Sequence, residues 1–272
     1  MARSRYYHGM RATPDQALSR RDAVHSLATG LAAVCTTPML AHALGACAPT
    51  RYDELGRLNT RHAVATQRTA PGTHPLGLRK TRDGVLYLPA QYTPDAPVPL
   101  VLLLHGAGGS GAGIAQRFKG YADELGMAFV APDSAEVSWD RADRLTRDVA
   151  RIDAALAAAF RRINTTPERL RIGGFSDGAS YSLSVGLTNG DLFGRILALS
   201  PGFMDPARSR GRPAIYVTHG VRDEVLPIDR TSRRIVPMLR QAGYTVDYHE
   251  FDGRHEAPPE ICRPGFEWLI GS

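Results

Sequence analysis

One stretch constrains this chain more than any other: the pentapeptide GFSDG at residues 174–178. Residues 170–175 are strand-like, and residues 179–187 suit a helix. A serine between such segments occupies a strained turn, and Cβ atoms at the two glycine positions would collide where strand and helix meet. The stretch therefore predicts a strand, a sharp turn and a helix, with the Ser176 hydroxyl exposed at the carboxyl end of the strand.

Short apolar runs alternate with helical patterns along the rest of the chain. The nearly continuous apolar run 98–104 is typical of a strand buried on both faces of a parallel sheet. The predicted strands are 84–89, 98–104, 127–132, 170–175, 196–200, 214–218 and 246–251, and the predicted helices are 114–125, 143–163, 179–188, 231–242 and 259–270.

This alternation predicts an α/β protein with a doubly wound, mostly parallel sheet. The last two helices contain Pro237 and Pro264, which predicts a kink or a later start in each. Only about a dozen residues separate the strand ending at Ser200 from the one starting at Ala214, which is too short for a large lid domain. We therefore expect little or no lid and an open site.

Composition limits the class of protein. The chain has 272 residues, of which 43% are hydrophobic and 22% charged, and this suits one globular domain and excludes disorder throughout. The net charge is +6, but no dense basic run with interleaved aromatic residues is present. A nucleic-acid partner is therefore not expected.

Residues 1–47 are interpreted as an export signal. The sequence SRRD at 19–22 precedes a moderately apolar stretch, and this resembles a twin-arginine signal. The sequence LGAC at 44–47 resembles a bacterial lipobox, in which Cys47 would be lipidated. The alternatives are cleavage after AHA at 41–43, giving a soluble secreted protein, or an uncleaved cytoplasmic or membrane-held N-terminus. A permanent spanning helix is disfavoured, because polar residues and proline interrupt the apolar run.

We therefore expect an exported protein, held by a lipid anchor on a membrane and facing the periplasm or the cell exterior. The polar residues 48–75 show no sustained period and are interpreted as a tether or a loosely packed entry into the domain, and residues 76–272 form the expected globular domain. Cys262 would be the one thiol of the mature domain, so no intramolecular disulfide is expected. It lies among apolar residues and is interpreted as a core residue.

The chemically competent residues follow strand ends, where sites of doubly wound sheets lie. Ser176 is the candidate nucleophile. Asp223 follows the strand 214–218 and can accept the Nδ1–H of a histidine, with Glu224 as the alternative acid. His255 follows the strand 246–251 and can take the serine proton and return it to a leaving group.

The other histidines receive structural interpretations. His249 lies within a strand pattern, and His105 and His219 precede glycines at strand ends, where they would orient loops. Metal ligands at characteristic spacing are absent from the sequence.

The glycine-rich sequence HGAGGSG at 105–111 follows the strand 98–104. Such a turn can point backbone N–H groups at a developing oxyanion, and we assign these donors to Ala107 and Asp177. The alternatives are a loop that merely turns or a phosphate cradle, and the second lacks the terminal Gly-Lys-Ser/Thr pattern. Ser110 misses the pattern of the first pentapeptide by one residue and is left out of the catalytic set.

Four motifs together resemble the α/β-hydrolase superfamily: LHGAGG at 104–109, GFSDG at 174–178, HGVRD at 219–223 and GRHE at 253–256. Within it they are similar to small bacterial carboxylesterases, phospholipases and polyhydroxyalkanoate-depolymerase-like esterases. The resemblance covers residues 84–270 and names no substrate. Arg254 departs from the Gly-Gly-His common in such enzymes, and it would narrow the entrance or bind an anionic group.

The resemblance implies a serine carboxylester hydrolase that works through a Ser-His-Asp triad and an acyl-enzyme, without a cofactor. Alternatives with the same triad are a thioesterase, lipase, phospholipase or polyester depolymerase, and a different one is a non-catalytic, membrane-tethered binding lipoprotein. A peptidase is disfavoured because no substrate-selecting domain is present. Trp139, Phe203 and Met204 either wall an acyl pocket or pack the core. The expected partner is a small-molecule or lipid ester, and the sequence leaves the oligomeric state undetermined.

Overall fold

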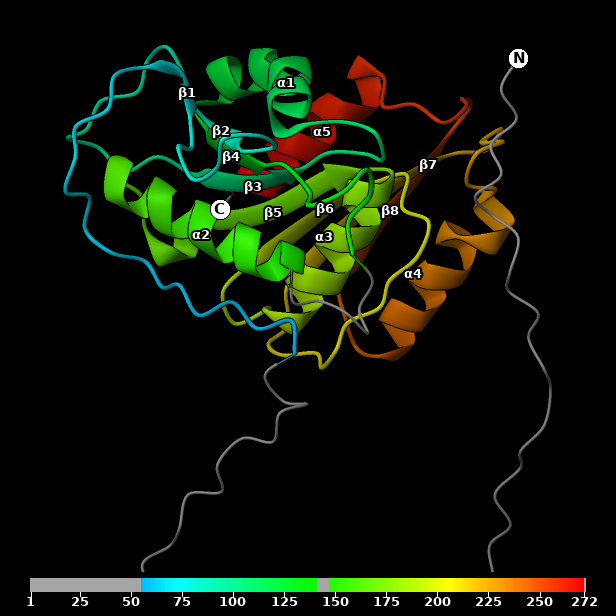
Figure 1. The fold of residues 1–272 in the computed structure, drawn as a ribbon. Helices are drawn as coiled ribbons and strands as arrows, with labels where there is room; N and C mark the ends of the chain where they lie inside the picture. Colours follow the sequence, from blue (N-terminus) through cyan, green and yellow to red (C-terminus); the bar gives the residue numbers. More distant parts are fainter. Residues whose placement is uncertain (1–54, 141–146, 272) are drawn as a thin grey trace, which may run out of the picture. The chain divides into compact units, whose positions relative to one another are not determined.

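An eight-stranded sheet runs through the protein in the order β1-β2-β4-β3-β5-β6-β7-β8 (Figure 1). The structure is a computed structural model, and it describes residues 55–140 and 147–271. The predicted export signal 1–47, including Cys47, and residues 48–54 lie outside the described residues. The strands are β1 (Gly72–Pro75), β2 (Gly84–Leu88), β3 (Leu100–Leu104), β4 (Ala128–Pro132), β5 (Leu170–Phe175), β6 (Arg195–Leu199), β7 (Ala214–Gly220) and β8 (Val246–Phe251).

The strands from β4 to β8 in this order are parallel, whereas β1 and β2 pair antiparallel at one edge. Helices cover both faces. One face carries α1 (Gly111–Leu125) and α5 (Pro259–Ile270), and the other carries α2 (Arg147–Arg162), α3 (Asp177–Thr188) and α4 (Ser232–Gln241). The prediction of a doubly wound, mostly parallel sheet is confirmed.

Alternate side chains of β3 enter two separate cores. Val101 and Leu103 pack with α1 and α5, and Leu102 and Leu104 pack with the helices of the other face. Because both faces are covered, every position of the strand is apolar, as the sequence pattern predicts. Cys262 is fully buried in the first of these cores, so its predicted place there is confirmed.

Most predicted elements are present with ends that differ by a few residues. The strands 170–175 and 246–251 and the helix 259–270 have the observed bounds. The helices α4 and α5 continue through Pro237 and Pro264, which lie on their exposed sides, where the missing backbone hydrogen bond faces water. None of the described helices is long and apolar enough to cross a membrane.

The described part of the predicted tether packs on the domain instead of standing free. Leu58 is 1% exposed, and its N–H donates to the Asn189 side chain at 2.9 Å. Arg57 forms an ion pair with Asp191 at 2.7 Å, and residues 72–75 form β1, which the sequence analysis did not predict. These contacts are scattered along the chain, so they leave no periodic pattern by which a packed segment is recognised.

The turn between β5 and α3 lies directly against the end of β3. A Cβ atom at Gly178 would lie 2.2 Å from the Leu104 carbonyl oxygen, and one at Gly174 would lie 2.5 Å from the Gly178 oxygen. The two strands are parallel neighbours, with Leu104 paired to Gly174. The predicted collision at both glycines is therefore confirmed, and only hydrogen atoms fit in this contact.

We expect Gly178→Ala to destabilise the protein by about 2–4 kcal/mol, because the methyl group must displace backbone atoms of β3. Gly120→Ala is the matched control: Gly120 lies within α1 with no atom within 4 Å of an added Cβ. It should stabilise the protein by about 0.5–1 kcal/mol. Urea unfolding followed by circular dichroism measures both, and equal midpoints for the two variants would contradict the contact described here.

Candidate active site

Ser176 occupies the turn between β5 and α3 with a strained backbone. Its φ of 59° lies in the left-handed region, which side chains other than glycine rarely adopt. The backbone N–H donates to the Leu199 carbonyl at 2.9 Å, which holds the turn over β6. The side chain makes no cap hydrogen bond to α3. The hydroxyl is therefore available to another group, and it lies 2.8 Å from Nε2 of His255.

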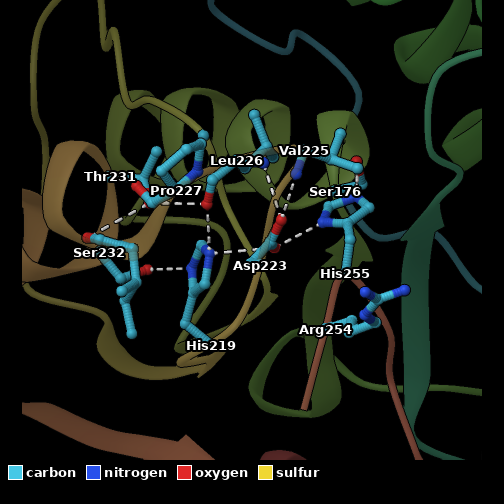
Figure 2. A network of polar contacts seen from close by, with 12 residues as sticks. Ser176, His219, Asp223, Val225, Leu226, Pro227, Thr231, Ser232, Arg254 and His255 are labelled. Carbon is cyan, nitrogen blue, oxygen red and sulfur yellow. Dashed lines mark hydrogen bonds and ion pairs between the residues drawn. The ribbon is translucent and has the colours of Figure 1, made fainter.

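His255 connects this hydroxyl to a buried carboxylate (Figure 2). Its Nδ1 lies 2.6 Å from Oδ2 of Asp223. Nδ1 must carry the hydrogen in this contact, which leaves Nε2 to accept the hydrogen of the Ser176 hydroxyl. The three residues follow β5, β7 and β8, and parallel strands end at the same edge of the sheet. The fold thus brings together the three side chains that the sequence analysis assigned to catalysis.

The Asp223 carboxylate is held by four N–H groups. Oδ1 accepts from the backbone of Val225 at 2.9 Å and of Leu226 at 2.7 Å. Oδ2 accepts from His255 and lies 3.2 Å from Nε2 of His219. The side chain has no exposed surface, so these donors replace the water that a carboxylate requires.

Glu224, the alternative acid, lies on the surface and not in the buried position of Asp223. Its carboxylate is 77% exposed and forms an ion pair with Arg254 at 3.1 Å. Arg254, the residue that departs from the Gly-Gly-His pattern, is 72% exposed in this pair. Its position next to His255 is drawn in Figure 2.

His219 was interpreted from the sequence as a loop-orienting residue, and its contact with Asp223 was not foreseen. The ring is fully buried, with Nε2 at 2.8 Å from the Leu226 carbonyl and Nδ1 at 2.7 Å from Oγ of Ser232. Burial lowers the pKa of His219 below its ordinary value. The sequence shows only that His219 precedes a glycine at a strand end. This pattern does not reveal that the ring contacts Asp223.

The backbone donors proposed for an oxyanion flank Ser176. α3 begins at Asp177, so the N–H of Asp177 has no helical acceptor. In the glycine-rich turn, the N–H groups of Gly108 and Gly109 donate to backbone carbonyls at 2.7 and 2.9 Å. The N–H of Ala107 has no acceptor among the described residues.

This turn approaches the nucleophile closely. A Cβ atom added to Gly106 would lie 3.4 Å from Cβ of Ser176. The carboxylate of Asp177 accepts from the Ser138 hydroxyl at 2.7 Å and from the Trp139 N–H at 3.0 Å. These bonds fix the first turn of α3. The sequence pattern did not predict that Ser138 would contact Asp177.

Ser110, which the sequence analysis left out of the catalytic set, has a structural role. Its side chain caps α1 by accepting the N–H of Gly113.

Trp139, expected as a wall of an acyl pocket or a packing residue, is a packing residue. It is 4% exposed, its indole N–H donates to the His105 carbonyl at 2.8 Å, and its ring stacks on Tyr181 with centroids 5.2 Å apart. His105 is also buried: Nε2 accepts from the Ser134 N–H at 3.0 Å and Nδ1 lies 2.8 Å from the Gly106 carbonyl. Burial lowers the pKa of His105.

Phe203 and Met204 are half-buried, and Met204 packs against the core on the side of α3. Their role in binding an acyl group stays a prediction.

A cavity of about 550 Å³ lies beside the glycine-rich turn. Phe175 and Arg117 are among its lining residues, and Phe203 and Met204 are not. Within residues 55–140 and 147–271, no cluster of three or more His, Cys, Asp or Glu side chains could hold a metal ion.

Comparisons with known proteins show similarity to esterases and thioesterases. The family described as Phospholipase/Carboxylesterase matches residues 140–264. Acyl-protein thioesterase 1 of Gibberella zeae is 32% identical over 104 residues, which cover 35% of this chain and 44% of that relative. Feruloyl esterase C of Emericella nidulans is 30% identical over 156 residues, covering 54% of this chain and 57% of that relative. The chain thus spans about half the length of these relatives.

Among solved structures, esterase PE8 superimposes with a TM-score of 0.57 at 24% identity, over 68% of this chain and 96% of that one. This likeness shows a common fold.

We expect the free energy of unfolding to decrease as the pH is lowered from 7 to 5. His105 and His219 have lowered pKa values in the folded protein, so unfolding below pH of about 6.5 takes up protons. Each proton taken up weakens stability by about 1.4 kcal/mol per pH unit within this window. Urea unfolding at pH 7, 6 and 5 measures the slope.

The variant His105→Gln should show a smaller slope than the wild type, because one titrating group is removed. Gly120→Ala, which removes no titrating group, is the control and should keep the wild-type slope. Identical slopes in His105→Gln and the wild type would show that His105 titrates normally.

Proposed function

We propose that this chain, which has the α/β-hydrolase fold and resembles the phospholipase and carboxylesterase family, is a serine carboxylester hydrolase. The observation that carries the proposal is the continuous hydrogen-bond chain from Ser176 through His255 to Asp223. Ester hydrolysis needs a nucleophile, a base and an oriented acid in this order, and two backbone N–H groups beside the nucleophile add an oxyanion site.

In the first step, Oγ of Ser176 attacks the ester carbonyl carbon while its proton passes to Nε2 of His255. The carboxylate of Asp223 stabilises the imidazolium that forms. The carbonyl π electrons move to oxygen, and the N–H groups of Ala107 and Asp177 donate to this oxyanion.

In the second step, the oxyanion re-forms the carbonyl and the bond to the alcohol oxygen breaks. His255 gives its proton to the departing alcohol, which leaves the acyl group as an ester of Ser176. Water then attacks this acyl-enzyme, with His255 again accepting and returning a proton, and the carboxylic acid is released. These steps call for no cofactor.

The short connection between β6 and β7 leaves the strand ends accessible to an ester substrate. The connection between β6 and β7, residues 200–213, contains no helix, and its one contact of sheet type is the isolated bridge between Gly190 and Gly211. Since no lid is built there, the substrate approaches the strand ends directly.

The relative named acyl-protein thioesterase favours thioesters as a second candidate, because the same triad attacks a thioester carbonyl. Phospholipid and polyester substrates are further members of this chemical class. The rival proposal, a binding lipoprotein without catalysis, gives no reason for a serine at a strained φ within reach of a histidine. Export and anchoring through Cys47 remain part of the proposal.

We expect Ser176→Ala to lower kcat for p-nitrophenyl esters by about a thousandfold or more, because the nucleophile is lost while the turn is kept. Ser182→Ala in α3 is the matched control: Ser182 is buried, and its hydroxyl has no hydrogen-bond partner in the described part of the chain. Its kcat should stay within about twofold. Assays from acetate to palmitate, with circular dichroism of each variant, test this.

Retention of more than a tenth of the activity by Ser176→Ala would overturn the assignment of the nucleophile. Labelling by a fluorophosphonate probe gives an independent readout, since only an activated serine reacts. Wild-type protein that is folded, hydrolyses none of the esters and does not react with the probe would support the binding lipoprotein.

A further inference from the structure

The cavity beside the glycine-rich turn is positively charged. Two arginines, Arg82 and Arg117, line it, and none of its lining residues is acidic. Arg82 donates from Nε to the Ser134 carbonyl at 2.8 Å and from Nη2 to the Ser134 hydroxyl at 3.0 Å, so its side chain is fixed by neutral groups. The neighbouring Asp133 accepts the N–H of Gly111 at 2.6 Å and does not line the cavity.

Arg117 also lacks a carboxylate partner among the described residues. Its Nη2 donates to the Ala257 carbonyl at 3.3 Å, and its guanidinium carbon lies 4.9 Å from the centroid of the Phe175 ring. The same ring lies 5.1 Å from the ring of His255. Phe175 therefore contacts both the Arg117 guanidinium and the ring of His255, so the positive charge lies close to the proposed base.

We infer that the site prefers esters that carry a carboxylate a few bonds from the scissile carbonyl, with Arg117 as the counter-charge. This rests on the proposed ester hydrolysis and names its substrate class. A guanidinium offers paired N–H donors that match a carboxylate, and Phe175 supplies an apolar surface for the chain between carboxylate and ester. A neutral ester would leave both arginine charges of the cavity without a partner.

The test compares ester pairs of matched size that differ in charge. The first pair, mono-p-nitrophenyl adipate and its terminal amide, varies the acyl arm. The second, 4-carboxyphenyl butyrate and 4-carbamoylphenyl butyrate, varies the alcohol arm. We expect kcat/KM to favour the carboxylate of at least one pair by about three- to tenfold at low salt, and the preference to shrink at high salt.

Arg117→Gln should remove most of this preference, measured as the ratio of kcat/KM between the charged and the neutral ester of each pair, and Arg117→Lys should keep part of it. Arg234→Gln, an exposed arginine on α4, is the matched control and should keep all of it. Equal rates within both pairs, or a preference that survives Arg117→Gln, would overturn the inference. Hydrolysis of neutral esters reports separately on the proposed function.

A second, independent observation concerns the buried side of Asp223. The chain of contacts in Figure 2 continues beyond the triad, from Asp223 to His219 and Ser232. Nε2 of His219 faces two acceptors, the Leu226 carbonyl and Oδ2 of Asp223, so this nitrogen must carry the hydrogen. Nδ1 then accepts from the Ser232 hydroxyl, and the neutral ring has one fixed tautomer.

We propose that His219 is a positioning residue for the acid. A carboxylate has about four lone-pair directions, and in Asp223 two face backbone N–H groups, one faces His219 and one faces His255. Because groups in the protein interior face three of the four lone pairs, the remaining lone pair of Oδ2 points toward His255. Removal of His219 as a donor leaves His255 as the remaining partner of Oδ2 and leaves more negative charge on that oxygen.

The test compares His219→Leu, which removes the donor, with His219→Gln, whose amide can donate again. For a short neutral ester we expect kcat of His219→Leu to fall by about ten- to a hundredfold with KM within about twofold. The acidic limb of its kcat/KM profile should move to higher pH, because extra charge on Oδ2 favours the protonated form of the neighbouring base. His219→Gln should restore most of kcat and the wild-type limb.

An unchanged kcat and acidic limb in His219→Leu would overturn this proposal. An equal loss in both variants, with no displacement of the limb, would also overturn it, since that result means that His219 only fills space. The fold of each variant is checked by urea unfolding, so that lost activity is not confused with lost structure.

Discussion

The backbone contact between the start of α3 and the end of β3 determines the geometry of the whole site. With no side-chain atom at Gly174 or Gly178, the helix begins directly over two adjacent parallel strands. Ser176 is thereby forced to a φ of 59°, and its hydroxyl is directed away from the helix that follows. The same contact brings the glycine-rich turn against Ser176, so nucleophile and backbone donors are fixed by one piece of packing.

Burial explains why the acid is so fully bonded. A carboxylate without exposed surface is costly unless donors replace its water, and Asp223 has two backbone and two histidine partners. Each partner is constrained in turn, as Ser232 and Leu226 fix the ring of His219. A polar network satisfied at every member is rigid, and such rigidity suits the proton transfer that we propose between Ser176 and His255.

The surroundings of this rigid centre are open and charged. No lid covers the strand ends in the described part of the chain, and the adjacent cavity of about 550 Å³ carries Arg82 and Arg117. Under the proposed function, the triad supplies acyl-transfer chemistry that many esters share, and we expect the shape and charge of this neighbouring cavity to select among them. Proteins of one fold can act on many different esters in this way, because the triad stays fixed while the side chains around it vary.

The sequence by itself predicted the sheet and its helices, and it placed Ser176, Asp223 and His255 after strand ends, because strand and helix periods and tight turns are local properties. It left Trp139 open between a pocket wall and the core, and it did not foresee the packing of Leu58 or the contact of His219 with the acid. Hydrogen bonds that join residues 32 and 79 positions apart are set by tertiary packing alone. Whether a buried tryptophan or histidine faces a site or a core depends on such packing, and no local pattern records it.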